Sequence, residues 1–168
     1  MLDDALRTAQ EFAGHEEFSH RAWLLIGVIQ RERGYQQNAL DAWNRIAEFD
    51  PEDQDLQIAA NVFLTQFASL HIELGYLKEA EQLVIRSLTI RDFTEAHYQA
   101  GLADDLQGDS ATAEQHWQRA LEFKLYHLNT RESLARVAIA AGDGAGAELI
   151  LKPILQGEPE RSSTAYLM

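Results

Sequence analysis

Small and large apolar residues recur along the chain in one pattern, interrupted each time by a glycine. The four glycines are separated by 41, 33 and 34 residues: Gly34, Gly75, Gly108 and Gly142. A small residue lies seven positions before each of them: Gly27, Ala68, Gly101 and Ala135. An alanine lies five positions after each: Ala39, Ala80, Ala113 and Ala147. Because every flanking position agrees, the chain contains an internal repeat.

The spacing predicts a helical hairpin in each repeat. A glycine can adopt the left-handed conformation that ends a helix without strain at Cβ. The small residue before it lies two turns back on the first helix, and the alanine after it lies early on the second, so that the helices can approach closely. Larger apolar residues fill the remaining space: Ile26, Phe67 and Leu134 before the turn, and Trp43, Val84, Trp117 and Leu151 after it.

The first hairpin resembles the tetratricopeptide repeat (TPR) family. Its matching residues are Ala22, Trp23, Leu24, Leu25, Ile26, Gly27, Gly34, Tyr35, Ala39, Trp43 and Pro51, and Pro159 matches the closing proline of the last unit. The later units depart from the family pattern at several positions. His97 and Arg131 stand in place of Trp23, Ser87 stands where the family usually has alanine, and Asp92 and Leu125 replace the closing proline. The resemblance implies an all-α, right-handed α-solenoid of TPR helix-turn-helix hairpins, with about ten helices.

The repeats predict a single TPR solenoid over residues 1–168. We expect a half-repeat at 1–19, full repeats at about 20–52, 53–92, 93–126 and 127–159, and the start of a further helix at 160–168. Ala5, Ala9 and Phe12 lie 34 residues before Ala39, Trp43 and Ile46, so the first segment is predicted to be the second helix of a unit. Both ends then fall within a unit, which is typical of a fragment of a longer TPR superhelix.

The first interval between glycines is longer than the family period. Residues 50–53 have the acids and proline of a helix start, and no breaker follows before Gly75. This pattern predicts one long helix from about Pro51 to Leu74. A small loop near Asp55 is the alternative.

Charge narrows the range of partners. The chain of 168 residues has 27 acidic and 14 basic side chains, a formal net charge of −13. Such a surface repels phosphate backbones and anionic membranes, so we expect neither nucleic acid nor membrane as a partner. It would attract a protein or peptide with basic flanks, although acidity also simply maintains solubility. The sequence start lacks the regions of a signal peptide and no apolar run could span a bilayer, which slightly favours the cytoplasm.

The chemistry-bearing residues indicate a protein that is not an enzyme. There are no cysteines, no Gly-x-Ser-x-Gly nucleophile turn and no phosphate loop with lysine. The glycine-rich run at residues 142–146 lies at a predicted hairpin turn. The histidines show no zinc-ligand spacing: His15, His20, His71, His97, His116 and His127. We expect no cofactor and no metal.

The resemblance implies that the first helix of each unit lines a concave groove. The groove positions of the first two units are Arg21, Leu24, Val28, Arg31, Val62, Thr65, Ser69 and Ile72. Those of the last two are Glu95, Tyr98, Leu102, Asp105, Asn129, Glu132, Arg136 and Ile139. The basic cluster with which family members hold chaperone C-termini is absent, because Leu24, Val28, Gln66, Glu95 and Gln99 occupy its places.

The leading hypothesis is a non-catalytic protein–protein interaction scaffold that binds a peptide or partner protein in this groove. Two alternatives remain open. The chain could be the regulatory or substrate-docking arm of a larger enzyme, or a self-assembling module whose copies associate weakly through apolar chain ends near Leu6, Phe12, Tyr166 and Leu167.

Overall fold

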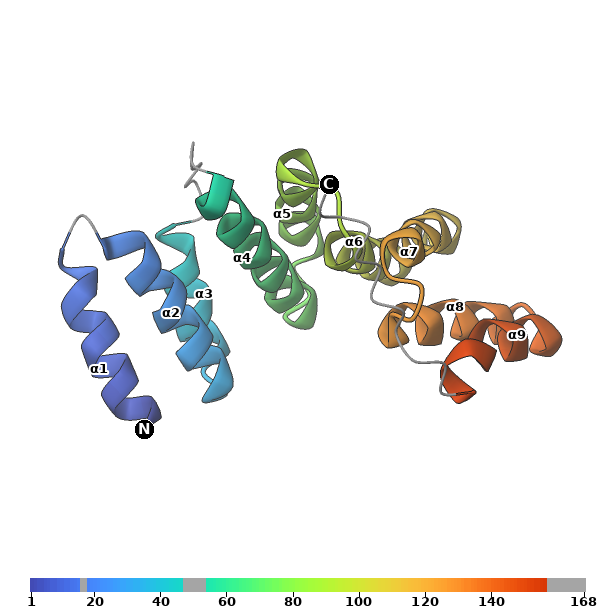
Figure 1. Cartoon of the computed structure of the whole chain (residues 1–168), viewed down its shortest axis with the longest axis horizontal. Coiled ribbons are helices and arrows are strands. Elements are labelled where there is room, and N and C mark those ends of the chain that lie inside the picture. The colour runs from blue at the N-terminus through green and yellow to red at the C-terminus, as the bar shows by residue number, and fades with distance from the viewer. Residues whose placement is uncertain (16–17, 47–53, 157–168) are drawn as a thin grey trace. The chain divides into compact units, whose positions relative to one another are not determined.

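The computed structural model describes residues 1–15, 18–46 and 54–156, and its regular structure there is entirely helical (Figure 1). The helices of the first part are α1 (Leu2–Ala13), α2 (Ser19–Glu32), α3 (Gln36–Asn44), α4 (Gln54–Glu73) and α5 (Leu77–Ile90). Those of the second part are α6 (Thr94–Leu106), α7 (Ser110–Phe123), α8 (Leu128–Ala140) and α9 (Gly144–Leu155). The further helix expected at 160–168 lies outside the described residues.

Each predicted hairpin forms at its glycine. The four turn glycines have φ between 80° and 90°. After each of them, an amide donates back across the end of the first helix, as Tyr35 does to Gln30 at 2.9 Å and Asp143 to Ala138 at 2.8 Å. These bonds satisfy carbonyls that the helix end leaves without partners. The sequence pattern therefore placed all four turns correctly.

The long helix is present as α4, which ends at Glu73. It runs unbroken from Gln54, so the loop considered near Asp55 does not form. The predicted start at Pro51 lies outside the described residues.

The chain divides into two compact units, and the first is Met1–Arg91. Its main core is aromatic: the Trp43 ring lies edge-on to Phe63 at 6.0 Å and to Phe67 at 5.7 Å. A smaller cluster joins α1 to the following hairpin through Ala9, Ile26 and Ala42. The α1 segment thus packs against the hairpin of α2 and α3.

The second unit begins at Asp92. Its core forms around Ala113, Trp117 and Leu134, with Tyr98, Leu102, Leu121, Val137 and Ile150 packed against them. Leu151, predicted as the large filler of the last hairpin, is only half-buried. It stands on α9, the last helix described.

Two hairpins are matched in detail around tryptophan. The indole of Trp43 donates to the Leu24 carbonyl at 3.1 Å, and that of Trp117 donates to the Tyr98 carbonyl at 3.3 Å. A Cβ added to Gly27 would lie 1.9 Å from Trp43 Nε1, and one added to Gly101 would lie 2.4 Å from Trp117 Nε1. These small positions are glycine because the indole occupies the space of a methyl group. The other two hairpins have alanine there and Val84 or Leu151 as the filler.

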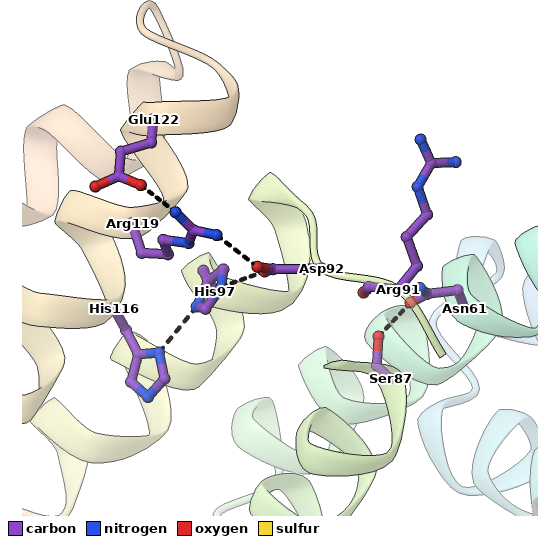
Figure 2. A network of polar contacts seen from close by, with 8 residues as sticks. All are labelled: Asn61, Ser87, Arg91, Asp92, His97, His116, Arg119 and Glu122. Atoms are coloured by element: carbon purple, nitrogen blue, oxygen red, sulfur yellow. Dashed lines mark hydrogen bonds and ion pairs between the residues drawn. The ribbon is translucent and has the colours of Figure 1, made fainter. Parts of the chain in front are cut away.

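The departures from the family pattern have their own partners. Ser87 is fully buried and donates to Asn61, whose amide donates to the Arg91 carbonyl at 3.1 Å (Figure 2). Arg131, buried in place of a tryptophan, donates to the carbonyls of Leu125 at 2.7 Å and Ile150 at 2.6 Å. Burial lowers the pKa of Arg131 from its ordinary value. Polar bonds, to the Asn61 side chain for Ser87 and to backbone for Arg131, thus replace apolar packing at these positions.

Candidate functional site

The predicted groove positions of the first compact unit, Met1–Arg91, lie on α2 and α4. Arg31 of α2 spans the two helices, because its guanidinium donates to Gln66 Oε1 at 2.8 Å and to Ser69 Oγ at 3.1 Å. It also forms an ion pair with Glu73. The structure therefore brings Arg31 and Ser69 into direct contact. The guanidinium of Arg31 is bonded entirely to side chains of α4 in these contacts.

The remaining positions of this unit differ in accessibility. Val28 is 39% and Val62 is 51% exposed, so each helix presents one valine to solvent. Leu24 and Ile72 are half-buried, and Leu24 packs against the aromatic core. Thr65 is only 2% exposed and its hydroxyl donates to the Val62 carbonyl at 2.8 Å. Thr65 is therefore a core residue that contributes nothing to the accessible surface.

Arg21 lies elsewhere, at an apolar pocket of about 630 Å³ between α1 and α2. The Phe12 and Phe18 rings meet edge to face there, with centroids 5.7 Å apart, and Leu25 and Ala22 complete the apolar wall. Phe12 and Leu25 are each 47% exposed. Of the two residues near which an exposed apolar face was predicted at this end, Phe12 is exposed, whereas Leu6 packs against the cluster of Ala9 and Ile26. Residues Tyr166 and Leu167 lie outside the described part of the chain.

In the second unit, Tyr98 is anchored rather than free. Its ring lies edge-on to His127, with centroids 5.3 Å apart, and packs with Leu102 against the Trp117 cluster. Burial raises the pKa of Tyr98, with further increases from the charges of Glu95 and Glu132, and a hydrogen bond with Ser133 opposes them. Tyr98 is therefore half-buried, and its hydroxyl is already bonded.

The charged positions around Tyr98 are largely paired. Glu95 Oε2 lies 3.5 Å from His127 Nε2, and this contact is the main reason why the pKa of Glu95 is below its usual value. Asp105 accepts from Arg136 Nη2 at 2.7 Å, which ties α6 to α8. Asn129 and Glu132 are exposed on α8. The structure thus brings Asp105 and Arg136 together, two groove positions of successive hairpins that the repeat spacing does not align with each other.

Sequence reasoning missed several members of this surface. Glu73 and Gln66 complete the contacts of Arg31, and His127 and Ser133 hold Glu95 and Tyr98. Glu73 lies one helical turn beyond Ser69, so the repeat spacing contained a signal for it. His127 precedes the first residue of α8, where helical periodicity gives no signal.

Within residues 1–15, 18–46 and 54–156, no three His, Cys, Asp or Glu side chains are grouped so that they could hold a metal ion. In the same residues, no helix combines the length and apolar character that crossing a membrane requires.

Solved structures show what this helical arrangement is similar to. No protein-family model and no curated protein sequence matches the chain. MamA (residues 41 to the end) from Desulfovibrio magneticus RS-1 matches with a TM-score of 0.77 and 16% identity, over 96% of this chain and 88% of that chain. The thermophilic TPR protein TTC0263 from Thermus thermophilus matches with a TM-score of 0.71 and 18% identity, over 95% and 84% of the two chains.

A tetratricopeptide repeat protein from Parabacteroides merdae ATCC 43184 matches with a TM-score of 0.71 and 22% identity, over 93% of this chain and 59% of that chain. The fold is the tetratricopeptide-repeat fold. The prediction of an all-α protein built from TPR hairpins is confirmed. At these identities the likeness concerns the fold, and TPR folds generally serve as protein-interaction scaffolds and are usually non-catalytic.

In the TPR fold, α2, α4, α6 and α8 are the first helices of their hairpins. The contacts of Arg31 with Ser69 and of Asp105 with Arg136 both join successive first helices. We therefore use the term first-helix surface for two sets of exposed side chains: those of α2 and α4 in the first compact unit, and those of α6 and α8 in the second.

Proposed function

We propose that this chain is a non-catalytic scaffold that binds a protein or peptide on its first-helix surface. The observation that carries the proposal is the direct contact between first-helix positions of successive hairpins, Arg31 with Ser69 and Asp105 with Arg136. Each contact makes two helices into one continuous surface. Val28 and Val62 remain exposed on the first of these surfaces, where a partner could bury them at a gain of about 25 cal/mol per Å².

The charge of the chain supports a partner with basic flanks. The net charge is −13, and on the first-helix surface Arg31 and Arg136 are each paired with an acid. Glu132 is exposed there on α8. Charges of this kind accelerate encounter with an oppositely charged partner more than they hold it in place.

A photo-crosslinking side chain placed at single positions tests the assignment of the surface. We expect partner adducts in the native cell from Val28, Val62 and Asn129, because these positions are exposed on first helices. Ile85 on α5 is 55% exposed and serves as the matched second-helix control. Adducts that come from Ile85 and not from the three first-helix positions would contradict the proposal.

The same experiment tests self-association. A crosslinker at Leu25, in the pocket between α1 and α2, reports contact between copies if it yields adducts of twice the chain mass. Such adducts would make this pocket a weak homo-oligomer contact. Adducts to a different protein there would instead extend the partner surface from α2 toward α1.

Once a partner is identified, Tyr98→Ala is expected to weaken its binding by roughly 2 kcal/mol or more, as expected for an aromatic anchor at an interface. Glu132→Gln is expected mainly to reduce the association rate and its salt dependence, because the side chain is exposed. Surface plasmon resonance separates the two effects. Because Tyr98 also packs in the core, Tyr98→Phe is the control that retains the ring. Unchanged binding by a folded Tyr98→Ala variant would exclude α6 from the binding face.

A further inference from the structure

A chain of polar contacts links the segment before α6 to α7 (Figure 2). His97 Nε2 lies 2.6 Å from Asp92 Oδ1, and His97 Nδ1 lies 3.0 Å from His116 Nδ1. The other oxygen of Asp92 accepts from Arg119 at 2.8 Å, and Arg119 also pairs with Glu122. His116 Nε2 lies 3.7 Å from a carboxylate oxygen of Asp104. Each imidazole therefore faces a carboxylate with Nε2 and the other imidazole with Nδ1.

The donors and acceptors of this cluster limit which ring nitrogens of His97 and His116 carry protons. An ionised carboxylate only accepts, so His97 Nε2 carries a proton that it donates to Asp92. The neutral His97 ring then presents a lone pair at Nδ1, and the 3.0 Å contact requires a proton on His116 Nδ1. These two contacts are met by two protons on the four nitrogens. One further proton, at His116 Nε2 facing Asp104, would give the pair one positive charge and leave the donor between the rings in place.

A bound metal ion fits this geometry less well than a proton. Zinc–nitrogen bonds are about 2.0–2.1 Å long, so two nitrogens 3.0 Å apart would subtend roughly 95° at the metal, well below the tetrahedral angle. In the described part of the chain, no third ligand joins the two rings. A proton between the two nitrogens needs neither a third ligand nor a bent approach.

The surroundings resist a second positive charge on the pair. His97 is 9% exposed and its ring stacks on Phe123, with centroids 6.1 Å apart. Burial lowers the pKa of His97, the Asp92 contact raises it, and the charges of His116 and Arg119 lower it again, leaving a net decrease. From α8, Arg131 and Arg136 bind elsewhere, to backbone carbonyls and to Asp105.

We propose that His97 and His116 form a site that accepts only one positive charge and thereby makes the packing of α6 against α7 sensitive to pH. With one N–H and one lone pair at the two Nδ1 atoms, the 3.0 Å contact is a hydrogen bond. Full protonation of both rings would place two N–H groups against each other across this contact. The α6–α7 hairpin is then destabilised when both rings become cations. The inference concerns the chain alone and does not depend on the proposed function.

The acid side of this dependence has a definite sign. An unfolded histidine titrates near pH 6.5, and His97 titrates lower in the folded chain. The unfolded state therefore binds more protons as the pH falls below about 6.5, and the folded state loses stability there. A difference of one proton corresponds to about a tenfold change in the unfolding equilibrium constant per pH unit.

Nuclear magnetic resonance of the full chain with ¹⁵N-labelled histidine tests the site directly. From about pH 4.5 to 9, the signals of His97 are expected to shift in two steps, because strongly coupled groups titrate as a pair. In His116→Gln, His97 is expected to titrate in one step, whereas His15→Gln, at the exposed end of α1, is expected to leave both steps unchanged. Independent single-step titrations in the parent chain would overturn the proposal without any variant.

Urea unfolding followed on α6 and α7 amides provides the second readout. The parent is expected to lose stability below about pH 6.5 by up to tenfold in the unfolding constant per pH unit, and His97→Gln/His116→Gln is expected to have a flatter profile. Equal pH profiles for the two chains would overturn the proposal. Stoichiometric shifts of both histidine signals on adding zinc alone would also overturn it, because the site would then bind a metal.

Discussion

Replacing Trp43 or Trp117 with alanine is expected to lower the free energy of unfolding of its own unit by about 3–5 kcal/mol. Both side chains have no exposed surface. Trp43 lies against Phe63 and Phe67, so truncation leaves a cavity among rings that cannot collapse freely. Each substitution also removes an indole donor from a carbonyl, that of Leu24 or Tyr98.

Urea unfolding followed by circular dichroism measures the effect. Because the chain divides into two compact units, two transitions are expected, with Trp43→Ala shifting one and Trp117→Ala the other. Trp23→Ala is the matched control: its ring is half-buried under the guanidinium of Arg45 at 4.4 Å, and a smaller loss is expected. If Trp43→Ala costs no more than Trp23→Ala, the tryptophan-centred packing of the hairpin is wrong.

The second large effect is expected from Gly101→Ala, at about 1–3 kcal/mol for a single added methyl group. The new Cβ would lie 2.4 Å from Trp117 Nε1, so the indole or the helix must move. Alanine itself suits this fold position, since Ala68 is fully buried in the hairpin that has Val84 as its filler. The cost therefore arises from the tryptophan and not from the helix.

A double-mutant cycle isolates that cause. Gly101→Ala combined with Trp117→Val reproduces the alanine–valine pair of the second hairpin, and we expect it to cost less than the sum of the two single changes. Gly144→Ala is the control, because nothing lies within 4 Å of its added Cβ and its φ is not positive. Strict additivity of Gly101→Ala and Trp117→Val would show that the two residues do not share the space.

Part of the candidate surface was predictable from the repeat and part was not. The shared spacing placed Arg31, Ser69, Asp105 and Arg136 on first helices, and the structure brings them together in pairs. The same spacing predicted that Thr65 lies on the surface, but the structure buries it. Helical periodicity specifies the direction of a side chain from its own helix, but it does not specify what a neighbouring helix covers.

The sequence by itself determined the turns, the hairpins and the small-residue positions, because each depends on residues close together in the chain. A glycine at φ near 80°, such as Gly34, reflects a backbone preference that acts within one turn. The tertiary structure alone decided the contacts between distant residues: the indole over Gly101, the backbone bonds of buried Arg131, and the facing imidazoles of His97 and His116. These contacts depend on which side chains meet when helices pack. The residues involved are far apart in the chain, so no local sequence pattern specifies that they lie close together.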